Sequence, residues 1–179
     1  NGKVVIGEGE RDKAPMLYIG ETIGKGEVKV DIALDPLEGT TITAQGGENA
    51  LSVLAIGEEG SFLHAPDIYM KKIAYGYKYE NLEINIDDEP TKIIKEFSKY
   101  SKIRNENIVV CILDRPRHKE LISQVRSTGA RIKLIPDGDV SAVIATSIDE
   151  SGIDLYMGTG GSPEGVLAAA ALRCMGGKI

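Results

Sequence analysis

The second half of the chain alternates between short apolar runs and amphipathic segments, and this alternation constrains the fold more than any other feature. The run NIVVCIL at 107–113 is apolar on both faces, as strands buried in parallel sheets are. Amphipathic segments that follow Pro90 and Arg117 predict helices on either side of it. RIKLIP, DVSAVIAT, DLYMG and PEGVLAAAALRCM then predict strand, helix, strand and helix. This order favours a parallel sheet with right-handed crossovers.

The first half has more antiparallel character. APMLYIGETIG predicts a helix that Pro15 starts and Gly24 ends. The expected strands are KVVIG (3–7), VDIALD (30–35), ALSVLAIG and SFLHA as a hairpin (50–57 and 61–65), YMKKIAYG, and LEINI. We therefore predict an α/β chain, in which an α+β lobe over residues 1–85 is followed by an α/β lobe over residues 86–179.

Composition limits the chemistry. A net charge of −6 argues against a general nucleic-acid surface, and no apolar run approaches the roughly 20 residues that span a bilayer. Cys111 and Cys174 each lie in an apolar run, so we expect buried free thiols and a reducing, cytoplasmic location. With only two histidines, neither of which we assign a role, carboxylates are the expected metal ligands, which favours magnesium or manganese.

Polar or charged residues follow five of the predicted strands. Ligands of open α/β sheets bind at the carboxyl ends of strands, so these residues are the candidates for a site. They are Gly7-Glu8-Gly9-Glu10, Asp35 to Thr40, Asp114 to Arg117, Asp137 to Asp139, and Gly158 to Glu164.

The stretch DPLEGTT at 35–41 allows two interpretations. In the first, Asp35 caps a helix that has Pro36 at its first position, and Glu38 completes a capping box. In the second, Asp35 and Glu38 bind one cation, and the helix start at Gly39 and Thr40 offers N–H groups to an anion. The heptapeptide alone does not decide between them.

The other motifs also have a structural and a functional interpretation. Glu8 fits a turn carboxylate or a metal ligand. Glu164 fits either a metal ligand or the first turn of a helix capped by Ser162, and the four glycines before it let backbone approach a ligand closely. Arg115 and Arg117 fit a solvated basic turn or a clamp on a phosphate.

Two further motifs stay equally open. Asp137-Gly138-Asp139 fits a turn, and it fits sugar hydroxyls equally well. Tyr69 is expected to be half-buried in its strand.

Six stretches taken together resemble the class II fructose-1,6-bisphosphatases, the bacterial branch of the lithium-sensitive, metal-dependent sugar phosphatases. They are IGEGERDKAPMLYIGE, VDIALDPLEGTT, HAPDIYMKKIA, LDRPRH, PDGDV and GTGGSPEGVLAAAAL. They occur in the family's order over nearly the whole chain, and the first two and the last are specific to the family. The resemblance implies the layered sugar-phosphatase fold, with mixed sheets and helices.

The resemblance also implies a set of site residues and a Mn²⁺ or Mg²⁺ cofactor. The metal ligands fall on Glu8, Asp35, Glu38 and Glu164. The substrate contacts fall on Glu38, Gly39, Thr40, Tyr69, Arg115, Pro116, Arg117, Asp137, Gly138, Asp139 and Gly161. Glu8 and Thr40 are the implied catalytic residues, and Thr40 positions the attacking water.

The implied reaction is hydrolysis of the 1-phosphate of fructose 1,6-bisphosphate in gluconeogenesis, with sedoheptulose 1,7-bisphosphate as a second substrate of some members. A homo-oligomer, either a dimer or a tetramer, is expected, with no nucleic-acid or membrane partner. The family has a segment upstream of Glu8 that carries a Lys and an Asp of the site, and it continues past Lys178. We therefore expect this chain to be a piece of a longer protein.

The alternative function is a truncated or inactive module that binds a sugar phosphate and cations without turnover. A phosphatase of inositol phosphates or nucleotide 3′-phosphates is a weaker alternative, because PRH and PDGDV favour the bisphosphatase.

Overall fold

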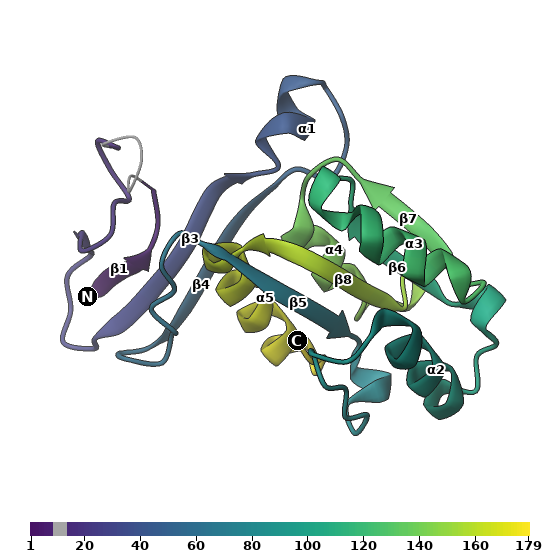
Figure 1. The fold of residues 1–179 in the computed structure, drawn as a ribbon. Helices are drawn as coiled ribbons and strands as arrows, with labels where there is room; N and C mark the ends of the chain where they lie inside the picture. The colour runs from purple at the N-terminus through teal and green to yellow at the C-terminus, as the bar shows by residue number, and fades with distance from the viewer. Residues whose placement is uncertain (9–13) are drawn as a thin grey trace.

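The computed structural model describes residues 1–8 and 14–179, which form two four-stranded sheets and the helices that cover them (Figure 1). The strands are β1 (Gly2–Ile6), β2 (Thr22–Ile23), β3 (Val30–Glu38), β4 (Leu51–Glu58), β5 (Tyr69–Tyr75), β6 (Val109–Leu113), β7 (Arg131–Ile135) and β8 (Leu155–Gly161). The α-helices are α1 (Thr40–Ala44), α2 (Pro90–Ser101), α3 (Lys119–Ser127), α4 (Asp139–Ala145) and α5 (Ser162–Met175). Short 3₁₀ turns are η1 (Tyr77–Tyr79), η2 (Asn105–Asn107), η3 (Pro116–His118) and η4 (Asp149–Ser151).

The first sheet has the order β2-β1-β3-β4. Strand β1 runs parallel to β3, and this pairing ends at Ile6 and Ala33. Strand β4 is antiparallel to β3, with a register shift between Asp35 and Glu38. The carboxyl ends of β1 and β3 therefore lie at the same edge of this sheet.

The second sheet has the order β5-β8-β6-β7 and confirms the predicted alternation of strands and helices. Strand β6 is parallel to both β7 and β8, and α3 and α4 connect these three strands. Strand β5 is antiparallel to β8. Residues before the predicted lobe boundary near residue 85 therefore belong to the same sheet as residues after it. The division into lobes stays a prediction.

Helices α4 and α5 form a layer between the two sheets. On one side, Val140 of α4 and Leu167 of α5 pack in a cluster with Ile6 and Ala33 of the first sheet. On the other side, residues of the same helices pack with residues of β5, β6 and β8; this second cluster contains Ala74, Cys111, Ala142, Val143, Ile153, Tyr156, Ala168 and Leu172. The yellow helix α5 is seen between β4 and β8 in Figure 1. The layers are thus sheet, helices, sheet, helices.

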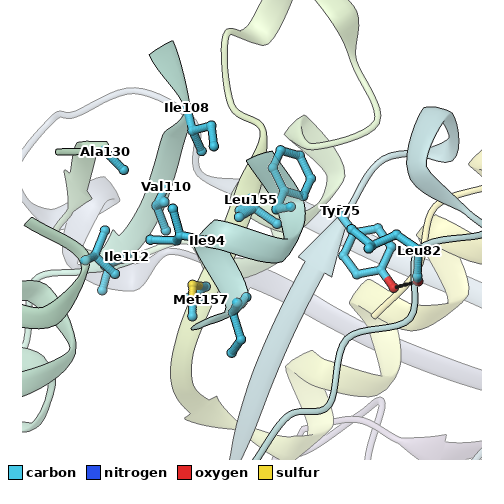
Figure 2. Packing of buried hydrophobic residues seen from close by; sticks show 12 residues of the cluster. Tyr75, Leu82, Ile94, Ile108, Val110, Ile112, Ala130, Leu155 and Met157 are labelled. Carbon is cyan, nitrogen blue, oxygen red and sulfur yellow. Dashed lines mark hydrogen bonds between the residues drawn. The ribbon is translucent and has the colours of Figure 1, made fainter. Parts of the chain in front are cut away.

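Helices α2 and α3 cover the outer face of the second sheet. Figure 2 shows how Val110 and Ile112 of β6 and Leu155 and Met157 of β8 meet Ile94 of α2. Because side chains alternate along a strand, Cys111 points to the opposite face, towards α4 and α5. This two-sided burial explains why the run at 107–113 is apolar throughout.

The helix expected between Pro15 and Gly24 is absent from the described residues 14–24, and the prediction was wrong. Instead, backbone bonds tie the segment to β1: the N–H of Val4 donates to the Glu21 carbonyl and that of Glu8 to the Leu17 carbonyl, each at 2.9 Å. Strand β2 then pairs antiparallel with β1. Pairing with an open sheet edge outweighs the weak local preference for helix. Gly9 and Glu10 of the predicted strand end lie outside the described residues.

Two predicted strands were also wrong. Residues 61–65 do not pair with β4. They pass beside Gly57 instead, where a Cβ added to the glycine would lie 3.3 Å from the Phe62 ring. Residues 82–86 form a loop, in which the carbonyl of buried Leu82 accepts a hydrogen bond from the Tyr75 hydroxyl at 2.6 Å (Figure 2). Their apolar pattern therefore reflects packing onto the core rather than sheet pairing.

Two side chains are more exposed than predicted. Tyr100 of α2 was expected on the buried stripe with Phe97, but it lies in the last turn and is 43% exposed. Cys174 was expected to be buried and is exposed; it lies near the end of α5, two residues beyond Leu172, the last buried residue of that helix. Cys111 is buried as predicted, and burial raises the pKa of its thiol to about 11.

None of the helices in the described part of the chain is long and apolar enough to cross a membrane.

Phe97 is fully buried and meets Tyr79 edge to face, with ring centroids 4.7 Å apart. We expect Phe97→Ala to lower the free energy of unfolding by about 3–5 kcal/mol, since it leaves a cavity in the cluster of Figure 2. Tyr100→Ala on the same helix should change it by less than about 0.5 kcal/mol. Urea denaturation measures both values, and equal losses would contradict this account of α2.

Candidate active site

The carboxyl ends of the parallel strands in the two sheets meet at one place, where α1 and the start of α4 lie. The backbone N–H of Thr41 in α1 donates to Asp137 Oδ2 at 3.0 Å, which joins the end of β3 to the end of β7. The carboxylate of Glu38 accepts a hydrogen bond from the backbone N–H of Val140 in α4. The structure thus brings together the predicted residues of DPLEGTT and PDGDV.

The structure decides against the capping interpretation of DPLEGTT. Strand β3 continues through Glu38, and α1 begins only at Thr40, so Pro36 is not at a helix start. The Asp35 carboxylate accepts from the backbone N–H of Leu37 at 3.0 Å, within the irregular end of the strand. Gly39 makes the turn with a φ of 94°, a conformation that disfavours side chains, and no side chain caps α1. Neither carboxylate therefore caps α1.

Five carboxylates from three segments influence one another here, and we call them the carboxylate cluster. They are Asp35, Glu38, Asp137, Asp139 and Glu164. Burial, followed by repulsion from Asp139, Asp137 and Asp35, raises the pKa of Glu38 from 4.5 to about 8. Burial and, more weakly, repulsion by Asp137 raise the pKa of Asp35.

Glu164 has the same character. Burial is the main cause that raises the pKa of its carboxyl; Asp139 and Asp35 add to the effect and Lys72 opposes it. Helix α5 begins at Ser162, but the Ser162 hydroxyl bonds to the Pro66 carbonyl, so it does not cap the helix as predicted. Glu164 folds back over Gly161, where a Cβ would collide with its carboxylate.

The cluster fits a bound cation. Glu38 Oε2 and Glu164 Oε2 are both buried and have no hydrogen-bond partner, an arrangement that costs free energy unless a ligand satisfies it. Carboxylate oxygens are the ligands that Mg²⁺ and Mn²⁺ prefer. Among the residues that the structure describes, however, no three acidic, histidine or cysteine side chains are already arranged to hold a metal together.

The other implied metal ligand, Glu8, lies at the end of β1, beside the end of β3. Its backbone forms a parallel bridge with Tyr18, two residues beyond the last β1–β3 pair. Asp35 also lies two residues beyond that pair. The topology thus places Glu8 at the right edge of the sheet, and its part in binding a metal stays a prediction.

The loop at 115–117 presents two guanidinium groups at the same edge. Arg117 Nε donates to the Thr159 carbonyl at 2.9 Å, and its guanidinium lies 4.5 Å from the centre of the Tyr69 ring. Tyr69 is 64% exposed rather than half-buried as predicted, because it begins β5 opposite Gly161. Arg115 bonds to the Pro136 carbonyl and lies 3.6 Å from Asp137 Oδ1.

The arginine pair is therefore not a freely solvated turn. Each guanidinium is held on one side by a carbonyl and on another by an aromatic ring or a carboxylate. Such fixed guanidinium groups suit a phosphate, because less conformational entropy is lost when it binds.

The remaining predicted residues line the same region. Thr40 is the exposed first residue of α1, Pro116 begins the turn before α3, and Gly138 is the N-cap of α4. Asp139, the first residue of α4, is buried. Their roles in binding and catalysis stay predictions.

Two glycines of GTGGSPEG leave room for side chains of neighbouring residues. A Cβ at Gly160 would lie 2.5 Å from Asp139 Oδ2 and 3.2 Å from Lys72 Nζ. A Cβ at Gly158 would lie 3.3 Å from the His118 ring. At these two positions the close approach is to neighbouring side chains, whereas the sequence interpretation had expected a ligand.

Sequence reasoning missed Lys72, Tyr156 and His118. His118 is buried; its Nδ1 bonds to the Leu113 carbonyl at 2.7 Å and its Nε2 accepts from the Thr159 N–H at 2.8 Å. It thereby links the ends of β6 and β8 next to Arg117. A signal existed for Lys72, since strand alternation places it on the face of Met70 and Ala74, opposite Lys71.

A separate groove of about 860 Å³ lies between β4, β5 and α5. Its lining is mostly apolar and includes none of the predicted site residues. Because a site for a phosphorylated sugar needs convergent polar groups, the strand ends are the better candidate.

Glu38 should give the metal-free protein a stability that depends on pH. Its pKa is higher in the folded state than in the unfolded chain, so the folded state binds more protons between pH 4.5 and about 8. The free energy of unfolding should therefore fall as the pH rises through this window, by at most about 1.4 kcal/mol per pH unit. Urea denaturation at several pH values measures the slope.

Glu38→Gln should reduce this slope, and Glu59→Gln, on the exposed turn after β4, should leave it unchanged. A slope that is the same in Glu38→Gln as in the parent protein would show that Glu38 does not carry the effect.

Comparisons with known proteins identify the family. Residues 1–179 match the family described as "Bacterial fructose-1,6-bisphosphatase, glpX-encoded". The chain is 46% identical over 191 residues to the "D-fructose 1,6-bisphosphatase class 2/sedoheptulose 1,7-bisphosphatase" of Trichodesmium erythraeum, and 47% identical over 191 residues to the Synechocystis protein of that name. Each alignment covers 99% of this chain and 55% of the relative.

A third protein of that name, from Gloeobacter violaceus, is 45% identical over 188 residues, or 98% of the chain and 54% of the relative. The chain thus spans about half the length of the curated relatives it matches. Since the family match extends over every residue, the chain belongs to the bacterial, glpX-encoded fructose-1,6-bisphosphatase family.

Proposed function

We propose that the protein containing this chain hydrolyses the 1-phosphate of fructose 1,6-bisphosphate, giving fructose 6-phosphate and phosphate, and that it also accepts sedoheptulose 1,7-bisphosphate. The observation that carries the proposal is the pair of buried, unpartnered carboxylate oxygens on Glu38 and Glu164, at an edge that also presents two fixed arginines. A cation-binding cluster beside a phosphate clamp is the chemistry that a metal-dependent sugar phosphatase needs. The names of the relatives support the same substrates.

Glu8, Asp35, Glu38 and Glu164 would hold Mn²⁺ or Mg²⁺. Bound there, the metal supplies Lewis-acid polarisation of the phosphoryl group and lowers the pKa of water. The raised pKa of Glu38 means that its proton leaves when the cation binds, so cation affinity rises with pH. Thr40, exposed at the start of α1, positions the attacking water with its hydroxyl.

The remaining residues bind and orient the sugar bisphosphate. Arg115 and Arg117 bind the distal phosphate, and the ring of Tyr69 packs against the Arg117 guanidinium. Asp137 and Asp139 accept hydrogen bonds from sugar hydroxyls. A cytoplasmic location and a homo-oligomeric assembly stay predictions that accompany this function.

Phosphate release from fructose 1,6-bisphosphate, measured with the full-length protein with and without Mn²⁺ or Mg²⁺, tests the proposal. We expect release that requires the cation, and kcat/KM lower by at least about 100-fold in Glu38→Gln and in Glu164→Gln. Glu59→Gln serves as the control and should be unaffected. Sugar-phosphate binding without release at any cation level would favour the binding module instead.

Arg117 should determine substrate choice more than chemistry. Arg117→Ala removes a charged hydrogen-bond donor from the distal phosphate, so KM for the bisphosphate should rise by about 10- to 100-fold. Turnover of a sugar 1-phosphate that lacks the distal phosphate should change little. Arg104→Ala, whose guanidinium pairs with Glu106 on the surface, is the control. An equal loss on both substrates would refute this division of labour.

A further inference from the structure

Lys72 is a buried cation at the edge of the carboxylate cluster. Its side chain, on β5, is 1% exposed, and its Nζ lies 2.6 Å from Asp139 Oδ2. The hydroxyl of Tyr156 lies 3.3 Å from the same oxygen. The side chain of Asp139 is itself only 7% exposed. One carboxylate oxygen of Asp139 is therefore held by two groups that solvent barely reaches.

Two glycines leave room for the Lys72 side chain. A Cβ at Gly160 would lie 3.2 Å from Nζ, and a Cβ at Gly165 would lie 3.3 Å from Cε. Both glycines belong to the β8–α5 connection that also carries Glu164. Lys71, the next residue on β5, points to the opposite side, where its side chain is 66% exposed and lies 3.6 Å from Asp87.

Stability alone gives a weak reason for this ion pair. Removing two charges from water costs about as much as their attraction returns, and apolar replacements of buried pairs are often as stable or more stable. The pair instead fixes one rotamer of Asp139, because Oδ2 is committed to Lys72 and Tyr156. The rest of the Asp139 carboxylate remains near Glu38, whose pKa Asp139 raises more than any other neighbouring charge does.

We propose that Lys72 is a positioning residue, which acts through Asp139 to orient that carboxylate towards a sugar phosphate. The inference rests on the proposed function, because that function makes Asp139 a contact of the sugar. Lys72 does not touch the substrate itself, since its side chain is 1% exposed and its ammonium group lies against Asp139 and Gly160.

Binding of fructose 6-phosphate to the full-length protein, measured by calorimetry in the presence of Mg²⁺, tests the inference without requiring turnover. Lys72→Met keeps the length of the side chain and removes its charge, and the Kd should rise by about tenfold or more. Lys71→Met removes the same charge from the exposed neighbour and should leave the Kd unchanged. Mn²⁺ affinity should be unchanged or tighter in Lys72→Met, because a cation has been removed from an acidic cluster.

A double-mutant cycle separates positioning from a loss of folding. Lys72→Met leaves Asp139 buried and unpaired, whereas Lys72→Met with Asp139→Asn removes both charges and should restore thermal stability. If Lys72 acts through Asp139, the double variant should bind fructose 6-phosphate as Asp139→Asn alone does. Additive losses would overturn the inference, and so would a Kd in Lys72→Met equal to that of the parent protein.

The outcomes also distinguish the two proposals. Sugar-phosphate binding that depends on Lys72, without phosphate release by the parent protein, would overturn the hydrolase and support the positioning role. Phosphate release by the parent protein, with no effect of Lys72→Met on binding, would support the hydrolase and overturn the positioning role. A parent protein that neither releases phosphate nor binds fructose 6-phosphate would overturn both.

Discussion

The packing of α4 and α5 between two sheets is the constraint on which the rest of the structure depends. Val140 and Leu167 meet the first sheet, while other residues of the same two helices meet the second. Because both helices are buried on two sides, they fix how the sheets lie relative to each other. The starts of these helices, at Asp139 and Ser162, are thereby held at the edge where the parallel strands of both sheets end.

Electrostatics at that edge follows from this packing. Five carboxylates gather there, each partly or fully buried, and burial is the first cause of the raised pKa values of Asp35, Glu38 and Glu164. Opposing charge comes from Lys72, which is buried with Asp139, and from Arg115 beside Asp137. The unpartnered oxygens of Glu38 and Glu164 mark where positive charge is still needed. The proposed function assigns a cation to these oxygens and a phosphate to the arginines.

Long periodic segments were the most predictable part of the fold. The apolar run that became β6 and the stripe of Ile93, Ile94 and Phe97 on α2 appear in the structure as expected. Short segments failed, because their apolar residues had several ways to be buried. Residues 15–24 pair with an open sheet edge, Phe62 crosses over Gly57, and Leu82 packs onto the core as a loop. In each case a tertiary contact outweighed a local preference.

By itself, the sequence determined the alternation of strands and helices, the acidic residues at the strand ends, and the motifs that identify the family. Those features are local, since periodicity and spacing can be read along the chain. Only the tertiary structure decided that DPLEGTT continues a strand to Glu38 and that its carboxylates meet Asp137 and Asp139, about 100 residues away. It also decided that Lys72 is buried as the partner of Asp139. Burial and repulsion between distant segments are properties of the packed layers, and no single stretch of sequence carries them.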